Sequence, residues 1–253
     1  MPSWDSARYL QFEEHRTRPA RDLLARVPHQ DPATVIDVGC GPGNSTSLLL
    51  HRWPRSTITA IDSSPEMLAQ AGRSVPGVTF VESDLRAWRP PRPADVVFSN
   101  ATLQWLGDHP AVLDHLLSWL APGGALAVQM PRNYAHPSHL RMRELAGARG
   151  EVLRGVLRVD PVATPIEYYR MLAGAGRHVD VWETEYLHVL EGDDPVVEWL
   201  RGSGLRPVLD RLGPEEGEGF VAEFAAAMRD AYPPEPDGTT LFPFLRLFFV
   251  VTG

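Results

Sequence analysis

A glycine-rich loop and two aspartates in the N-terminal third of the chain have the residue types that hold a nucleotide. The loop, Asp37-Val-Gly-Cys-Gly-Pro-Gly, overlaps the end of an apolar run at 34–38. Glycines placed where a strand turns into a helix let the backbone approach a ligand closely. Asp62, about 20 residues further on, ends a second apolar run, and its carboxylate can accept hydrogen bonds from both hydroxyls of a ribose. Together these residues predict a site for a nucleoside-containing cofactor.

Two kinds of cofactor use a glycine turn followed by an acidic residue, namely NAD and S-adenosylmethionine. The dinucleotide fingerprint requires a third glycine where this chain has Asn44. Asp37, at the start of the loop, would repel a pyrophosphate, but it attracts the positive amino and sulfonium groups of S-adenosylmethionine. The charge of the loop therefore favours S-adenosylmethionine.

Three more motif positions lie at the ends of predicted strands. Asp62 ends the second strand, Ser83-Asp84-Leu85 follows the third, and residues 100–105 follow the fourth. In this order, together with the loop at 37–43, they resemble the motifs of class I S-adenosylmethionine-dependent methyltransferases. The resemblance implies S-adenosyl-L-methionine as the cofactor, bound by Asp37, Gly39, Gly41, Asp62, Ser63, Met67, Asp84, Leu85, Asn100 and Trp105.

Short runs of β-branched and apolar residues alternate with helical patterns along the first half of the chain. The predicted strands of this part are 34–38, 57–61, 78–81, 94–99 and 125–129. Such alternation is typical of a parallel sheet with helices on both faces. With two more predicted strands at 179–189 and 241–251, we expect an α/β fold: a Rossmann-like doubly wound, mostly parallel seven-stranded sheet with a helical cap.

We expect residues 1–253 to form a single class I methyltransferase domain with three parts. An N-terminal lid covers approximately residues 1–30, and the cofactor-binding core spans 31–131. Predicted helical segments at 132–175 and 190–238 form the cap, under which we place the substrate. The second of these segments contains two predicted helices, 195–212 and 214–232.

A longer set of motifs extends the resemblance along nearly the whole chain. These motifs are Trp4-Asp5, Tyr9-Leu10, 16–20, 41–46, 61–65, 103–106, 128–131, 204–207 and 242–248. They resemble the trans-aconitate methyltransferases, a family within class I. The resemblance implies that a carboxylate of trans-aconitate, or of a similar small polycarboxylate, attacks the sulfonium methyl directly and becomes a monomethyl ester.

A carboxylate is already ionised at neutral pH, so this reaction requires no catalytic residue that removes a proton. Proximity and exclusion of water then supply most of the rate. The other carboxylates of the substrate need cationic or hydrogen-bonding partners. Arg246 is of particular interest because it interrupts an apolar strand, where an unpaired charge is costly. The substrate-binding candidates are Arg18, Tyr168, His188, Trp199, Arg206 and Arg246.

Composition excludes several other classes of function. The net charge of −8 argues against a nucleic-acid partner. All 24 basic residues are arginines, so Schiff-base chemistry on a lysine is excluded. Cys40 is the single cysteine, which excludes an intramolecular disulfide and fits a reducing cytoplasm. We expect no metal, no signal peptide, no membrane span, and a monomer or weak homo-oligomer.

Three alternative functions stay open. An enzyme that methylates a malonyl group on an acidic carrier would share the cofactor motifs, but it needs a basic docking surface. A regulatory protein could bind the cofactor without turnover, and dinucleotide binding would instead indicate an oxidoreductase. Methylation of amino groups in nucleic acids is disfavoured, because the fourth predicted strand ends in Ser99-Asn100-Ala101-Thr102 and not in Asn-Pro-Pro-aromatic.

Overall fold

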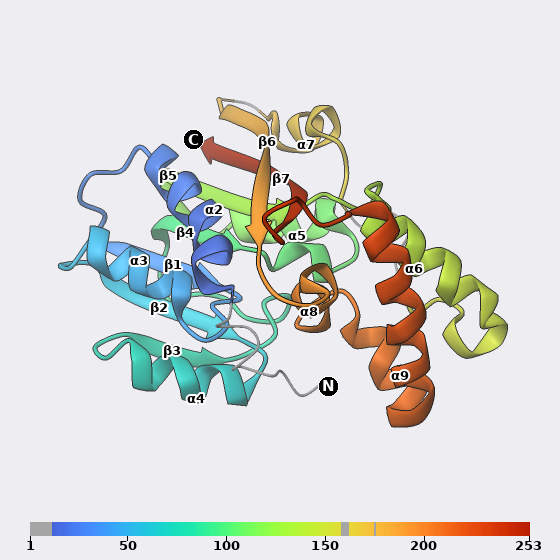
Figure 1. Cartoon of the computed structure of the whole chain (residues 1–253). Helices are drawn as coiled ribbons and strands as arrows, with labels where there is room; N and C mark the ends of the chain where they lie inside the picture. Colours follow the sequence, from blue (N-terminus) through green and yellow to red (C-terminus); the bar gives the residue numbers. More distant parts are fainter. Residues whose placement is uncertain (1–11, 158–161, 175) are drawn as a thin grey trace. The chain divides into compact units, whose positions relative to one another are not determined.

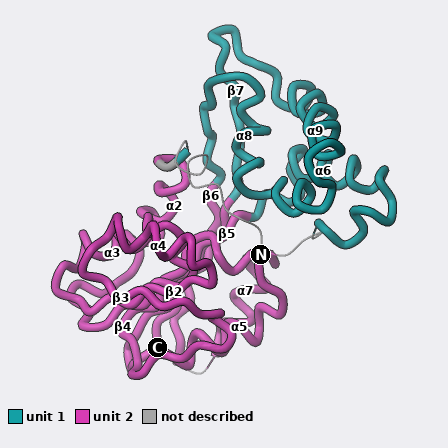
Figure 2. Tube along the Cα trace, turned by 90° about the horizontal axis from the view of Figure 1, so that it is seen from below, with its two compact units in different colours: residues 1–13, 132–160, 185–245 teal, residues 14–131, 161–184, 246–253 magenta. Residues whose placement is uncertain are grey.

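The computed structural model describes residues 12–157, 162–174 and 176–253 (Figure 1). The described residues divide into two compact units (Figure 2). Unit 1 comprises the described residues of 1–13, 132–160 and 185–245, and unit 2 comprises those of 14–131, 161–184 and 246–253. Trp4-Asp5 and Tyr9-Leu10, which carry part of the family resemblance and of the predicted lid, lie outside the described residues.

The described residues form a seven-stranded sheet with the order β3-β2-β1-β4-β5-β7-β6. The strands are β1 (Thr34–Val38), β2 (Thr57–Asp62), β3 (Thr79–Glu82), β4 (Ala94–Asn100), β5 (Leu120–Pro131), β6 (His178–Leu190) and β7 (Thr240–Thr252). β1 to β5 pair in parallel, whereas β7 pairs antiparallel with β5. The predicted doubly wound, mostly parallel seven-stranded sheet is confirmed. The strand order reverses between β1 and β4. In open sheets of this kind, ligands bind at the carboxyl ends of the strands beside such a reversal.

β5 begins earlier than the predicted strand at 125–129. Its first part contains Pro122-Gly123-Gly124, and these residue types favour a turn. In the structure the pairing with β4 skips residues 121–124, so the turn is a bulge within the strand. A Cβ added to Gly124 would lie 3.0 Å from the carbonyl oxygen of Ala94. Glycine is therefore needed there for β5 to approach β4 closely.

Helices cover both faces of the sheet in unit 2. These helices are α2 (Glu13–Arg26), α3 (Asn44–Arg52), α4 (Pro65–Ser74), η1 (Leu103–Trp105), α5 (His109–Leu117) and α7 (Pro165–Leu172). Phe248 and Phe249 are consecutive on β7 and so point to opposite faces. Trp182 stacks on Phe248 at 5.0 Å, and Arg26 of α2 lies 5.3 Å from the centre of the Trp182 ring. Tyr168 of α7 packs on Phe249 at 5.4 Å. α2 and α7 therefore lie on opposite faces.

Helix α4 begins with residue types that are common at the start of a helix. The side chain of Ser64 accepts a hydrogen bond from the Met67 backbone at 3.3 Å, and Pro65 occupies the first turn. Met67 and Ala71, one turn apart, are buried. The capped helix thus follows β2 directly and fixes the chain at the carboxyl end of that strand.

Unit 1 contains the helices that the sequence assigns to the cap, apart from α7. They are α6 (Pro137–Ala148), η2 (Gly150–Leu153), α8 (Pro195–Arg201) and α9 (Arg206–Ala231). Trp199 of α8 is buried at the centre of an aromatic cluster, stacked on His188 at 4.6 Å and packed on Phe12 at 5.0 Å and Phe244 at 5.5 Å. The predicted segment 132–175 is therefore divided between the two units, since α7 belongs to unit 2.

Helix α9 contains a break at Gly213, where φ is 76° and ψ is −176°. This confirms the predicted boundary between 195–212 and 214–232, because glycine tolerates positive φ and Pro214 lacks a backbone N–H. The predicted helical stretch at 195–212 is interrupted, since α8 ends at Arg201 and α9 begins at Arg206. In the part of the chain that the structure describes, every helix is too short or too polar to cross a membrane.

We predict that Arg52 stabilises the junction between α2 and α3. Its guanidinium donates to the carbonyl of Leu24 and, at 2.9 Å, to the carbonyl of Val27, and it lies 4.9 Å from the centre of the Trp53 ring. Arg52→Ala should lower the free energy of unfolding by about 1–3 kcal/mol, since these carbonyls lose a charged donor. Urea denaturation measures this change.

Arg55→Ala is the matched control for Arg52→Ala. Arg55 pairs with Asp31 at 2.8 Å, but the two side chains are 80% and 64% exposed. Loss of such an exposed pair costs at most about 1 kcal/mol. Equal destabilisation by the two substitutions would show that Arg52 does not hold the junction.

Candidate functional site

The backbone of the glycine loop is held by the end of β2. The N–H groups of Gly39 and Cys40 both donate to the carbonyl of Ile61, at 2.8 and 3.0 Å. The N–H of Gly41 donates to Asp62 Oδ2 at 2.9 Å. Gly41 has φ 54°, and a Cβ added there would meet no further described atom within 4 Å. The loop is therefore fixed in place and has open space at Gly41 for a ligand.

Thr102 ties the same loop to the end of β4. Its Oγ1 donates to the carbonyl of Gly39 at 3.1 Å. A Cβ added to Gly39, where φ is 68°, would lie 2.2 Å from the Thr102 side chain. The sequence places Thr102 in the segment after the fourth strand but does not single it out. Its role depends on a neighbour 63 residues away in the sequence.

Asp37 is fully buried beneath the loop. Its Oδ2 accepts hydrogen bonds from Ser45 Oγ at 2.8 Å and from Thr46 Oγ1 at 2.7 Å, both in the first turn of α3. Its Oδ1 is buried and has no hydrogen-bond partner among the described residues. Burial and, more weakly, the charge of Asp62 raise the pKa of Asp37, the hydroxyls of Thr46 and Ser45 lower it, and the resulting pKa is about 6. A cationic ligand group near Oδ1 would favour the ionised carboxylate.

Asp62 presents its carboxylate at the carboxyl end of β2. Oδ1 accepts from the Ser64 N–H at 2.9 Å, and Oδ2 accepts from the Gly41 N–H at 2.9 Å. Each oxygen has a second lone pair that can accept from a ligand hydroxyl. Ser63 is exposed beside it, and Met67 is buried. The structure thus joins Asp62 to the glycine loop, and Ser63 and Met67 lie in the segment that follows Asp62.

Asp84 follows β3, and its carboxylate binds the side chain of Arg86, a residue outside the motifs found in the sequence. Both of its carboxylate oxygens accept from the Arg86 side chain, at distances from 2.5 to 3.1 Å. The hydrogen bonds from Arg86 lower the pKa of Asp84. Leu85 between them is buried. A ligand amino group at Asp84 would therefore share this carboxylate with Arg86.

Asn100 and Trp105 lie at and just beyond the carboxyl end of β4. Asn100 Oδ1 is buried without a hydrogen-bond partner among the described residues. Trp105, at the end of η1, is 42% exposed, which is unusual for so large an apolar side chain. A buried acceptor and an exposed aromatic ring at one strand end are features that a bound ligand would satisfy.

Arg246 of β7 lies on the same face of the sheet as Asp37 and Asn100. Asp37 pairs with Phe98, Asn100 pairs with Gln129, and Gln129 pairs with Phe248, two residues from Arg246. Paired residues share a face, as do residues two apart in one strand. Arg246 is only 4% exposed, and its Nη1 lies 3.5 Å from Gln129 Oε1. A buried cation and the acceptor groups of the glycine loop therefore share one face of unit 2.

The other two substrate candidates of unit 2 are Arg18 and Tyr168. Arg18 is exposed on α2. The Tyr168 hydroxyl lies 2.5 Å from His109 Nδ1, and its ring packs on Phe249, which points away from the face of Arg246. The structure therefore does not group Tyr168 with Arg246.

The remaining substrate candidates belong to unit 1. His188 and Trp199 are both buried and stack on each other. Arg206 Nε donates to Asp210 Oδ1 at 3.1 Å, one turn further along α9. These contacts lie within unit 1, and the substrate role of all three residues stays a prediction.

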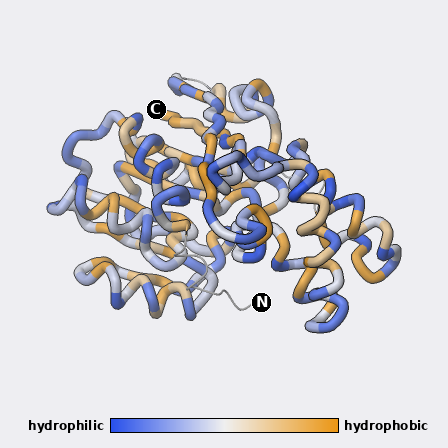
Figure 3. The backbone as a smooth tube through the Cα atoms, in the orientation of Figure 1, coloured by the Kyte–Doolittle hydropathy of each residue, from blue (hydrophilic) through white to orange (hydrophobic). Residues whose placement is uncertain are grey.

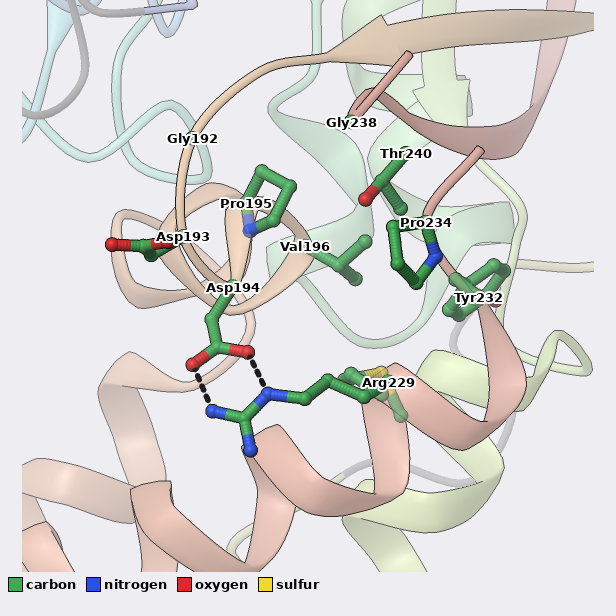
Figure 4. Close-up of a pocket in the computed structure, with 11 residues that line it drawn as sticks. Gly192, Asp193, Asp194, Pro195, Val196, Arg229, Tyr232, Pro234, Gly238 and Thr240 are labelled. Atoms are coloured by element: carbon green, nitrogen blue, oxygen red, sulfur yellow. Dashed lines mark hydrogen bonds and ion pairs between the residues drawn. The ribbon is translucent and has the colours of Figure 1, made fainter. Parts of the chain in front are cut away.

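Unit 1 also contains a shallow hollow (Figure 4). At its rim Asp194 accepts from Arg229 through two hydrogen bonds, Nε to Oδ1 at 2.7 Å and Nη2 to Oδ2 at 2.6 Å. The pair satisfies its own charges, and none of the predicted site residues lines the hollow. Among the described residues, there is no group of three or more His, Cys, Asp or Glu that could hold a metal ion.

Comparison with known proteins gives close relatives over nearly the whole length. The family model described as "Methyltransferase domain" matches residues 12–190. The trans-aconitate 2-methyltransferase of Azoarcus sp. (strain BH72) is 50% identical over 250 residues, covering 99% of this chain and 99% of the relative. The enzyme of the same name from Methylobacterium nodulans is 49% identical over 253 residues, covering 99% and 98%.

Solved structures share the fold at much lower identity. The YcgJ protein from Bacillus subtilis has a TM-score of 0.60 and 13% identity, covering 94% of this chain and 98% of its own. The plantazolicin methyltransferase BpumL, solved in complex with SAH, has a TM-score of 0.51 and 14% identity, covering 97% and 83%. The fold and the full-length relatives agree, and this chain belongs to the methyltransferase domain family and, within it, to the trans-aconitate 2-methyltransferases.

Proposed function

We propose that this chain is an S-adenosylmethionine-dependent carboxyl O-methyltransferase that forms the monomethyl ester of trans-aconitate or of a similar small polycarboxylate. The observation that carries the proposal is the buried guanidinium of Arg246 on the sheet face that also carries Asp37 and Asn100. The full-length relatives named for this activity, at 49–50% identity, support it.

The residues around the glycine loop fit S-adenosylmethionine. When bound, this cofactor supplies a methyl group activated by a positively charged sulfur. Asp37 Oδ1 and Asn100 Oδ1 are buried acceptors without partners among the described residues, and they suit a cationic amino group. Asp62 retains lone pairs that can accept hydrogen bonds from the ribose hydroxyls. Gly41 has no side chain and leaves space for the cofactor to approach the backbone of the loop.

Asp84, Leu85, Met67, Ser63 and Trp105 complete the proposed cofactor set. Asp84 would accept from an adenine amino group, with Arg86 holding the carboxylate in position. Buried Leu85 and Met67 offer apolar contact, and the exposed ring of Trp105 follows β4. Leu85, Met67 and Trp105 would exclude water from the ligand.

The methylation of a carboxylate requires no acid–base chemistry from the residues that bind the substrate. A substrate carboxylate is an anion at neutral pH, so no residue has to remove a proton from it. The protein has to orient this carboxylate and exclude water. We propose that Arg246 holds a second carboxylate of the substrate, because a guanidinium donates two parallel hydrogen bonds to such a group. Arg18, Tyr168, His188, Trp199 and Arg206 stay secondary candidates for this role.

We also propose that the protein works in the cytoplasm. Cys40 is its single cysteine, it is buried, and burial raises the pKa of its thiol, so the thiol is neither paired nor activated. This arrangement suits a reducing compartment.

We predict that the purified protein transfers a methyl group from S-adenosylmethionine to trans-aconitate. The assay uses labelled cofactor and separate reactions with trans-aconitate, cis-aconitate, isocitrate, citrate and a malonyl-carrier, with the products identified by mass. A monomethyl ester formed selectively from trans-aconitate supports the proposal. Selective transfer to the malonyl-carrier, or cofactor binding without transfer to any of the five, contradicts it.

Asp62→Asn should weaken cofactor binding. The amide keeps one acceptor oxygen, so either Gly41 N–H or Ser64 N–H loses its partner, and a charged acceptor for ribose disappears. We expect the Kd for S-adenosylmethionine, measured by calorimetry, to rise roughly 10- to 100-fold.

Asp95→Asn is the matched control for Asp62→Asn. Asp95 Oδ2 likewise accepts from two backbone N–H groups, those of Ala33 at 2.7 Å and Thr34 at 2.9 Å, but near the amino end of β4. It should lower stability and leave the Kd for the cofactor unchanged. An unchanged Kd in Asp62→Asn would remove Asp62 from the proposed site.

Arg246→Met should impair substrate binding while the cofactor still binds. Methionine has a similar length and fits a buried position but carries no charge. We expect the KM for trans-aconitate to rise roughly 10- to 100-fold, because a buried charged hydrogen bond is lost. Arg206→Ala tests the second arginine candidate in the same assay. If both variants keep the KM and kcat of the wild type, neither arginine binds the substrate.

A further inference from the structure

Gln129 is a fully buried amide at the carboxyl end of β5. Its Oε1 lies 3.5 Å from Arg246 Nη1. Because a guanidinium only donates hydrogen bonds, the amide oxygen must face Arg246, and the amide nitrogen faces away. That nitrogen, Nε2, is buried and has no hydrogen-bond partner among the described residues. A buried donor left in this way costs free energy unless a ligand accepts from it.

The register of the sheet places Gln129 between two site residues. It pairs with Asn100 on β4 and with Phe248 on β7, and Arg246 is on the same face as Phe248. All of these residues belong to unit 2. Gln129 therefore lies between the strand end with a buried acceptor, Asn100, and the strand with the buried cation, Arg246.

We propose that Gln129 Nε2 donates a hydrogen bond to a substrate carboxylate that Arg246 also binds. The inference rests on the proposed function and names a residue that determines substrate specificity. Gln129 Oε1 orients Arg246, and Gln129 Nε2 provides a second donor for the same anion.

An amide suits this position better than a carboxylate. A glutamate at 129 would form an ion pair with Arg246 and would neutralise the charge that attracts the substrate. Glutamine holds the guanidinium through a neutral oxygen, so the positive charge stays available to an anion, and it adds an N–H.

The carboxylate held here is one that does not react. A carboxylate that accepts hydrogen bonds from a guanidinium and an amide has its lone pairs engaged and is a weaker nucleophile. The methyl group would then be transferred to another carboxylate of the same molecule. Arg246 and Gln129 together would thus select substrates with at least two carboxylates.

We predict that Gln129→Met and Gln129→Glu raise the KM for trans-aconitate roughly 10- to 100-fold. Gln129→Met removes the donor at nearly unchanged size, and Gln129→Glu also neutralises Arg246. The Kd for S-adenosylmethionine should stay within about threefold of the wild-type value. An analogue of trans-aconitate that lacks the carboxylate bound by Arg246 and Gln129 should have the same KM with the wild type and with Gln129→Met. A panel of dicarboxylates identifies this analogue.

Ser99→Ala is the control for a merely structural effect. Ser99 is also fully buried, and its hydroxyl donates to the Val38 carbonyl at 3.1 Å, but it points to the other face of β4 from Asn100. It should lower the Tm and leave the KM for trans-aconitate unchanged.

The outcomes separate this inference from the proposed function. If the wild type methylates trans-aconitate and both Gln129 variants keep its KM, Gln129 does not bind the substrate and the proposed function stands. If the wild type methylates neither trans-aconitate nor another polycarboxylate of the panel, the proposed function is wrong. Calorimetric titration of trans-aconitate into wild type and Gln129→Met then decides the role of Gln129, because equal affinity, or no binding to either protein, overturns it.

Discussion

The turn after β1 depends on its neighbours for its hydrogen bonds. A tight turn of glycines has no helix or ladder of its own, and unpaired backbone N–H groups are costly when buried. Ile61 and Asp62, at the end of β2, accept from Gly39, Cys40 and Gly41. β1 and β2 therefore have to end at about one level for the loop to make these hydrogen bonds. The same requirement brings their functional side chains to one edge of the sheet.

Along this edge of the sheet, the candidate site residues on some strands accept hydrogen bonds and those on other strands donate them. Asp62, Asp37 and Asn100, on β2, β1 and β4, provide acceptors, and two of them have a buried oxygen without a partner among the described residues. Gln129 and Arg246, on β5 and β7, provide donors. The pKa of Asp37 is raised to about 6, chiefly by burial, so the stability of the fold falls as the pH rises from about 4 to about 6 and the carboxylate ionises. A cationic ligand beside it would offset this cost.

Much of the fold follows from the sequence because its determinants are local. Apolar runs such as 34–38 and the Ser64 cap fix strands and helices with their immediate neighbours. Thr102 and Gln129 could not be found in this way, because their partners are on other strands and depend on register. Tyr168 shows the same limit, since only the alternation along β7 places it on the face opposite Arg246.

The order of acceptors and donors also explains why a carboxylate suits the proposed reaction. An amine nucleophile would be a cation at neutral pH and would have to lose a proton to a nearby base before it reacts. The strands β5 and β7 offer an amide N–H and a guanidinium, which bind anions and accept no proton. An anionic substrate beside a cationic methyl donor also gains Coulombic attraction as water is excluded. The donors on β5 and β7 therefore suit an anionic substrate, which agrees with the proposed polycarboxylate.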